Sequence, residues 1–208
     1  MELELDEFEA WPKIGRLRRD VIITEKLDGT NGQISIRAAE MDRFPDNDLD
    51  AYVLVNGCAH YVRAGSRNKW IAPGKQDNAG FAGWVRENAD VLVELLGEGR
   101  HYGEWWGQGI QRRYDMDHKQ FSLFNVGRWN HAMFTEYDTE IDVVPTLYEG
   151  PFHTDSIQNV VDELERNGSV AAPGFMDPEG VIVFHTASRV SFKQTIKGDD
   201  APKSVTEG

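Results

Sequence analysis

Short apolar runs predict strands in the first third of the chain. Residues 21–23 form a continuous apolar run, and residues 33–37 alternate between apolar and polar side chains; both patterns are typical of strands. Residues 52–62 hold two further apolar segments, one on each side of Asn56-Gly57. Because this dipeptide best tolerates the positive φ angles of a two-residue turn, we expect a β-hairpin there.

The spacing of apolar residues predicts two amphipathic helices. From Phe81 to Leu96 apolar residues recur at steps of four, four, three and four, and two glycines follow, which is the period and the stop signal of a helix. A second helix is expected after the N-cap candidates Thr154 and Asp155, with residues 157, 160, 161 and 164 on one face and Gly168 as its end.

Strands outnumber the predicted helices and follow one another in runs. Further strand-like segments occupy residues 121–126, 181–185 and 189–192. This order favours an α+β fold with mostly antiparallel sheets flanked by helices over a doubly wound fold. No repeat or long linker divides the 208 residues, so we expect a single domain over residues 1–208.

The charge, hydropathy and cysteine content of the chain argue against several classes of protein. The chain has 22 basic and 35 acidic residues and a net charge of −13, which argues against coating nucleic acid by bulk electrostatics and requires any phosphate site to be local. A mean hydropathy of −0.52 argues against a membrane-spanning protein. Cys58 is the only cysteine, and residues 1–6 lack the features of a signal peptide, so a cytoplasmic location is expected.

The segment TEKLDGTNG, residues 24–32, is the most informative for chemistry. It lies between two predicted strands. A turn containing Gly29 and Gly32 lets the backbone approach a ligand closely and projects Lys26 from the end of a strand into a cleft. The alternative for an isolated segment of this kind is a β-turn that carries an exposed lysine.

Six segments in a characteristic order make the chain resemble the covalent nucleotidyltransferase superfamily of ATP-dependent RNA and DNA ligases and mRNA-capping enzymes. They are KLDGTN at 26–31, SRN at 66–68, YGEWWG at 102–107, LFNV at 123–126, PEGVIV at 178–183, and SFK at 191–193 with Lys197 nearby. Residues 103–111 resemble most closely the RNA ligases of the phage double-strand-sealing type. The resemblance implies a nucleotidyltransferase, or ATP-grasp-like, ligase core.

This resemblance implies a catalytic role for three side chains. Lys26 becomes the nucleophile that takes AMP from ATP. A free lysine has a pKa of about 10.4, so nearby positive charge must lower it before attack; Lys193 and a bound metal are expected to do this. Glu179 is the expected ligand for Mg²⁺ or Mn²⁺, because such ions are bound by a few carboxylates together with water and substrate phosphates.

The resemblance also implies a set of nucleotide-binding residues. Phe124 would stack on adenine instead of serving as a core phenylalanine, Glu104 would accept a ribose hydroxyl, and Arg67 would hold ribose or phosphate. Contacts of the main chain or side chains of residues 24 and 25 would select adenine. The full expected set is Thr24, Glu25, Asn31, Arg67, Glu104, Phe124, Lys193 and Lys197.

The final motif departs from the family pattern. The family has two lysines separated by one residue, but here Lys193 is followed by Gln194 and then by Thr195. Lys197 is the expected substitute for the second lysine. A rival hypothesis is that this change has ended catalysis and left a module that only binds nucleotide or nucleic acid.

The function expected from the resemblance is ATP-dependent joining of RNA 5′-phosphate and 3′-hydroxyl ends, through lysyl-AMP and an RNA-adenylate. The substrate would be RNA ends or a nicked duplex, with DNA nick sealing as the alternative in the same class. Only 11 residues follow Lys197, so we expect no appended OB-fold domain. The phage type suggests the cytoplasm of an infected host, and a protein partner is left open.

Overall fold

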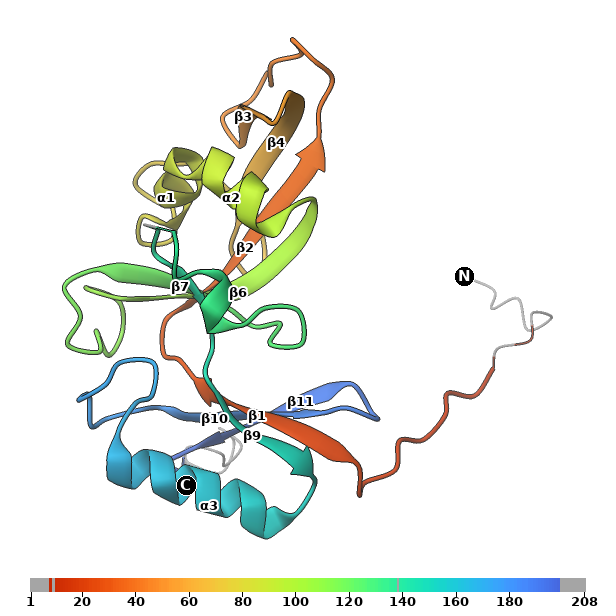
Figure 1. Cartoon of the computed structure of the whole chain (residues 1–208), viewed down its shortest axis with the longest axis vertical. Coiled ribbons are helices and arrows are strands. Elements are labelled where there is room, and N and C mark those ends of the chain that lie inside the picture. Colours follow the sequence, from red (N-terminus) through yellow and green to blue (C-terminus); the bar gives the residue numbers. More distant parts are fainter. Residues whose placement is uncertain (1–7, 9, 138, 199–208) are drawn as a thin grey trace, which may run out of the picture.

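The computed structural model describes residues 8, 10–137 and 139–198, and Figure 1 shows its two sheets one above the other. The elements in chain order are β1 (Asp20–Lys26), β2 (Thr30–Ala38), β3 (Asp50–Val55), β4 (Cys58–Gly65), β5 (Trp70–Ile71), α1 (Phe81–Glu87), α2 (Ala89–Leu96), β6 (Gly99–Gly107), β7 (Lys119–Leu123), a 3₁₀ turn (His131–Met133), β8 (Ile141–Val143), β9 (Thr146–Pro151), α3 (Thr154–Asn167), β10 (Gly180–His185) and β11 (Val190–Thr195). The α+β prediction is therefore confirmed.

Two sheets meet at the segment between β1 and β2. One sheet has four strands in the order β11-β10-β1-β9, and the other has the order β3-β4-β2-β6-β7-β8 with β5 paired to β4. All described pairings are antiparallel except that of β7 with β8. Because β1 belongs to one sheet and β2 to the other, residues 27–29 connect them and the predicted nucleophile lies at the junction.

Each sheet is covered by helices on one face (Figure 1). Helices α1 and α2 pack on the seven-stranded sheet around Ile34 and Phe121, and α3 packs on the four-stranded sheet against Val21 and Ile23. Successive side chains of a strand point to opposite faces, so the other face of each sheet is free to form a site. No helix in the described part of the chain has the length and apolarity that crossing a membrane requires.

The hairpin and both helical regions form where the sequence predicts them, with two differences in detail. Asn56 and Gly57 have φ angles of 53° and 79° at the tip of the β3–β4 hairpin. The helix expected from 81 to 96 is divided at Asn88, whose side-chain amide donates to the Trp84 carbonyl oxygen at 2.8 Å. Asparagine competes in this way with the helical hydrogen-bond pattern.

The start of α3 and the role of one glycine differ from the prediction. His153, not Thr154 or Asp155, is the N-cap residue. Gly32 lies inside β2 instead of the turn, and a Cβ there would come within 2.7 Å of the Phe81 ring. A Cβ on Gly29 would collide with the Trp105 carbonyl oxygen. Both glycines therefore allow close packing against neighbouring residues, and of the two only Gly29 lies in the predicted turn.

Candidate active site

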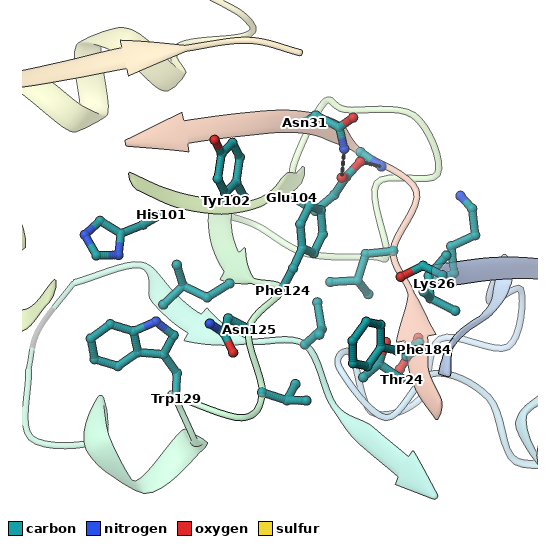
Figure 2. Close-up of a pocket in the computed structure, with 18 of the residues that line it drawn as sticks. Thr24, Lys26, Asn31, His101, Tyr102, Glu104, Phe124, Asn125, Trp129 and Phe184 are labelled. Atoms are coloured by element: carbon teal, nitrogen blue, oxygen red, sulfur yellow. Dashed lines mark hydrogen bonds between the residues drawn. The ribbon is translucent and has the colours of Figure 1, made fainter. Parts of the chain in front are cut away.

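A cleft of about 1060 Å³ lies between the two sheets and takes side chains from both of them. The four-stranded sheet contributes the face that α3 does not cover, with Thr24 and Lys26 on β1 and Lys193 on β11. The seven-stranded sheet contributes Glu104 on β6 and the loop after β7 contributes Phe124. Figure 2 shows the side chains of Lys26, Glu104 and Phe124 around a shared space.

Lys26 and Glu179 form an ion pair at one end of this cleft. Lys26 is the last residue of β1 and lies opposite Gly180, the first residue of β10, so strand pairing places residue 179 beside the lysine. The Lys26 Nζ atom lies 2.5 Å from Glu179 Oε1, and both side chains are largely buried. Glu179 Oε2 is buried and has no hydrogen-bond partner among the described residues. This oxygen therefore has capacity to bind a further cation.

Glu104 is the centre of a hydrogen-bond network next to the lysine. Its Oε1 atom accepts from the Gly29 backbone N–H at 3.1 Å, and its Oε2 atom accepts from Asn31 Nδ2 at 2.8 Å. The Asn31 Oδ1 atom accepts in turn from Arg67 Nε at 2.9 Å. Burial raises the pKa of Glu104 to about 7, although these hydrogen bonds and the charge of Lys26 oppose the shift. The network holds the β1–β2 turn to β6.

Phe124 lies at the cleft surface and outside the core. Strand β7 ends at Leu123, which is buried, and the next residue leaves the sheet. The Phe124 side chain is 43% exposed. An aromatic face that remains accessible beside polar groups is suited to stacking on a planar ligand.

The Glu25 side chain points away from the other predicted adenine contacts. Its Oε1 atom accepts from Ser169 Oγ at 2.6 Å, and its Oε2 atom accepts from the backbone N–H groups of Val170 and Ala171 at 2.9 Å. The side chain is 1% exposed, and burial raises its pKa. Thr24 lies on the cleft side of β1, so the side chains of Thr24 and Glu25 point to opposite faces of the sheet. The Glu25 carboxylate holds the loop after α3.

The three positions of the final motif have different surroundings. Lys193 lines the cleft and has no ion-pair partner among the described residues. Thr195 is buried opposite Gly180, which is itself opposite Lys26. Lys197 pairs with Asp177 at 2.7 Å and does not line the cleft. The charge expected from a second lysine is therefore absent at position 195, and Lys197 is held by a carboxylate outside the cleft.

The residues at the lysine end suit a divalent ion that substrate oxygens help to bind. The described residues contain no group of three or more His, Cys, Asp or Glu side chains able to enclose a metal. The unpaired Oε2 atom of Glu179 fits the ordinary coordination of Mg²⁺ or Mn²⁺, which takes one or two carboxylates and completes its shell with water and phosphate.

A comparison with known protein families identifies the family of this chain. Residues 19–197 match the family model described as RNA ligase. This chain belongs to the RNA ligase family. No curated protein gives a significant sequence match.

Solved structures of an RNA ligase share the fold. Naegleria gruberi RNA ligase is 16% identical in mutant forms solved with ATP and Mn or with AMP and Mn; each has a TM-score of 0.54, and the match covers 86% of this chain and 49% or 50% of that one. Its complex with PPi is 15% identical, with a TM-score of 0.51 and coverage of 86% and 50%. At this identity the likeness concerns the fold. The chain spans about half the length of these structures.

A charged cluster that the sequence did not reveal supports the site of this RNA ligase family member. Arg112 Nε donates to Asp28 Oδ2 at 3.0 Å, and Arg112 Nη1 donates to Asp177 Oδ2 at 2.7 Å. The Tyr114 hydroxyl accepts from the Asp28 backbone N–H at 2.8 Å. The segment 108–117 thus joins the turn after Lys26 to the residues before Glu179. In the sequence, Arg112 stands out only as one of two adjacent arginines in a polar segment.

Proposed function

We propose that this chain is an ATP-dependent RNA ligase that joins 5′-phosphate and 3′-hydroxyl ends through a lysyl-AMP intermediate. The observation that carries the proposal is the contact of Lys26 with Glu179 at the end of a cleft whose opposite wall carries Phe124. A nucleophilic amine, a carboxylate with a free oxygen and an exposed aromatic ring are the groups that nucleotidyl transfer to lysine requires.

In the first step the Lys26 amine attacks the α-phosphorus of ATP, a nitrogen–phosphorus bond forms and pyrophosphate leaves. The amine must be neutral to attack, so the Lys26 ammonium first passes a proton to the neighbouring Glu179 carboxylate or to solvent. The nitrogen loses a second proton to solvent as its bond to phosphorus forms. Glu179 would hold the divalent ion through its unpaired Oε2 atom, and the ion would supply positive charge to the phosphates during the transfer. We assign Arg67 and Lys193, which also line the cleft, to binding of ribose and phosphates.

In the later steps AMP passes to the RNA and then leaves. An oxygen of the RNA 5′-phosphate attacks the same phosphorus, and the nitrogen–phosphorus bond to Lys26 breaks. The 3′-hydroxyl then attacks the activated 5′-phosphate, and AMP departs. Throughout, Phe124 stacks on adenine and Glu104 accepts a ribose hydroxyl, while Thr24 and the main chain at Glu25 face the base. Lys197 would reach the phosphates only after leaving Asp177.

Intact-mass measurement after incubation with ATP and magnesium tests the proposal. We expect one added adenylyl group on the wild-type chain and none on Lys26→Ala. Lys75→Ala, which removes an exposed lysine away from the cleft, is the matched control and should retain the adduct. ATP binding without any adduct on the wild-type chain would contradict the proposal and would favour a binding module, consistent with the loss of a lysine at position 195.

The finer assignments belong to the same proposal. We assign Mg²⁺ or Mn²⁺ as the metal, residues 1–208 as one adenylyltransferase domain, the phage double-strand-sealing type as the subclass, and the cytoplasm as the location. Joining of a nicked RNA duplex that exceeds joining of the corresponding DNA nick would support the subclass. The reverse preference would assign the chain to DNA nick sealing.

A further inference from the structure

The cleft is larger than the part that one nucleotide attached to Lys26 requires. Its volume of about 1060 Å³ lies at the upper end of the range for sites that hold one small ligand. In Figure 2, Lys26 and Thr24 lie on one side of Phe124, whereas Tyr102, His101 and Trp129 lie on the other. Arg100, two residues before Tyr102 on β6, and Arg128, whose guanidinium lies over the Trp129 ring, also line the cleft. The part of the cleft lined by Arg100, Tyr102, Asn125, Arg128 and Trp129 is called the outer lobe below.

The outer lobe offers an aromatic face next to Phe124. Tyr102 and Glu104 are two residues apart on β6 and therefore share a face of the sheet. The Tyr102 side chain is 50% exposed, and its backbone carbonyl accepts from the Phe124 N–H at 2.9 Å. Two accessible rings on backbone segments in direct contact are suited to successive planar groups, as the bases of a nucleic acid strand are.

Positive charge at the outer lobe is not neutralised by neighbouring acids. Arg100 and Arg128 are exposed and line the lobe, and neither has a carboxylate partner among the described residues. Arg128 is held in place, since its guanidinium donates to the Leu96 carbonyl and lies over the Trp129 ring. In a chain with a net charge of −13, two unpaired arginines at one place indicate a local site for anionic groups.

A buried donor beside Tyr102 also lacks a partner. Gln33 lies opposite Tyr102 in the β2–β6 pairing. Its Nε2 atom is buried and has no hydrogen-bond partner among the described residues. Leaving a buried amide unpaired is unfavourable, but Gln33 is not among the residues that line the cleft, so its amide is no part of the outer lobe.

We propose that the outer lobe binds a nucleotide unit of the RNA strand, with a base stacked on Tyr102 and the adjoining phosphate held by Arg100 and Arg128. The inference rests on the proposed function, because it assigns the substrate of the same site. Single-stranded nucleic acid is bound elsewhere by the same combination of aromatic rings and a cationic groove. A second molecule of ATP is the other ligand with this chemistry, and the test separates the two.

The test compares RNA binding with adenylylation in two variants of the full chain. Binding of a short, labelled, 5′-phosphorylated RNA is followed by fluorescence anisotropy at several salt concentrations. We expect Tyr102→Ala to weaken RNA binding by about tenfold, the effect of losing one stacked base. We expect Arg100→Gln to reduce the slope of log affinity against log salt by about 0.7, the value for one phosphate contact of a single strand. Formation of the Lys26 adduct should remain at the wild-type rate in both.

Two control variants test whether the effects are specific to the outer lobe. Arg43→Gln removes an exposed arginine outside the cleft and should leave RNA affinity unchanged. Tyr102→Leu keeps apolar area on β6, so it replaces the alanine variant if that variant unfolds at a lower temperature than wild type. Unchanged RNA affinity in the folded Tyr102 and Arg100 variants would overturn the proposal. Weaker ATP binding with unchanged RNA binding would overturn it as well and would assign the lobe to a nucleotide.

Failure of the inference and failure of the proposed function give different results. If the wild-type chain forms no adduct, ligation through lysyl-AMP is wrong, while the anisotropy comparison still decides whether the lobe binds RNA. If the adduct forms and the variants bind RNA as wild type does, ligation stands and the outer lobe has no part in RNA binding.

Discussion

The cleft wall from the four-stranded sheet keeps unpaired charge, whereas the wall from the seven-stranded sheet has its central carboxylate hydrogen-bonded at both oxygens. On the first wall Lys193 has no ion pair among the described residues, and Lys26 contacts Glu179, whose Oε2 atom has no hydrogen-bond partner among them. On the second wall Glu104 accepts from Gly29 and Asn31. The first wall therefore has polar groups without protein partners, whereas the cleft-facing carboxylate of the second wall also holds the β1–β2 turn in place.

Two buried glutamates, Glu25 and Glu104, have similar hydrogen bonding but lie on different sides of the cleft wall. Glu25 and Glu104 both have a pKa raised by burial, and both carry hydrogen bonds on each oxygen. Glu25 binds the loop after α3 behind the four-stranded sheet, whereas Glu104 faces the cleft. A buried carboxylate with a raised pKa is therefore insufficient to mark a catalytic group, and the face of the sheet on which it lies decides its role.

Removing the carboxylate of Glu179 is the strongest way to test the difference between the walls. We expect Glu179→Gln to slow formation of the Lys26 adduct by about 10³-fold, comparable with the loss of a central electrostatic contact in other active sites. A time course of intact mass measures the rate. Glu94→Gln, which changes an exposed glutamate of α2, is the control. An unaltered rate in Glu179→Gln would remove this residue from the chemistry.

Substitution of Glu25 should affect stability more than chemistry. Glu25→Ala leaves Ser169 Oγ and two backbone N–H groups without their acceptor, so we expect the free energy of unfolding to fall by about 3 kcal/mol. Urea denaturation measures the loss. Glu25→Gln keeps one acceptor oxygen and should lose less. Equal stability of wild type and Glu25→Ala would show that the loop does not depend on this carboxylate.

Glu104 should make stability fall as the pH rises. Its pKa is about 7 in the folded chain against 4.5 for the ordinary group, so the folded state binds the proton more tightly than the unfolded state does. The free energy of unfolding should therefore decrease by about 2 kcal/mol between pH 5 and pH 7 through this group and level off above its folded pKa. Urea denaturation at several pH values measures the slope.

The matched variant for this pH effect is Glu104→Gln. It keeps an acceptor for Gly29 or Asn31 but carries no titrating group, so the difference in slope between it and wild type isolates Glu104. Identical slopes for the two proteins would mean that the carboxyl titrates in its ordinary range, and the second wall would then carry a charge throughout.

The smallest expected effect is that of replacing Phe124, the aromatic residue between the outer lobe and the lysine end of the cleft. Phe124→Leu keeps an apolar side chain at an exposed position but removes the planar face. We expect the KM for ATP in adenylylation to rise by about fivefold, the effect of losing one aromatic stacking contact, with little change in stability. An unchanged KM, measured by adduct formation at varied ATP concentration, would argue against stacking of adenine on this ring.

Local patterns were sufficient to predict much of the fold. The Asn56-Gly57 hairpin, the apolar face of α3 and the strands on either side of the lysine follow from periodicity and turn chemistry, which depend on neighbouring residues. The break at Asn88 and the N-cap at His153 were missed. Both depend on which local hydrogen bond a side chain or backbone group makes, and several such bonds compete at similar energy.

Several residues that the sequence named line one cleft, but their contacts were not predicted. Thr24 and Glu25 were grouped as contacts to adenine, yet the two-residue period of a strand sends adjacent side chains to opposite faces. That period was a signal that the sequence contained. The contacts of Arg112 with Asp28 and Asp177 had no such signal, because these residues lie 84 and 65 positions away from Arg112 in the sequence.

The sequence by itself determined the α+β class, the order of the segments and the identity of the lysine that ends a strand beside a glycine-rich turn. Only the tertiary structure decided that Lys26 meets Glu179, that Glu25 supports a loop, and that Tyr102 and Arg100 extend the cleft. The physical reason is that turns and periodicity are local properties of the chain. The pairing of β1 with β10, and of β2 with β6, brings together charges from distant segments and selects which face each one shares.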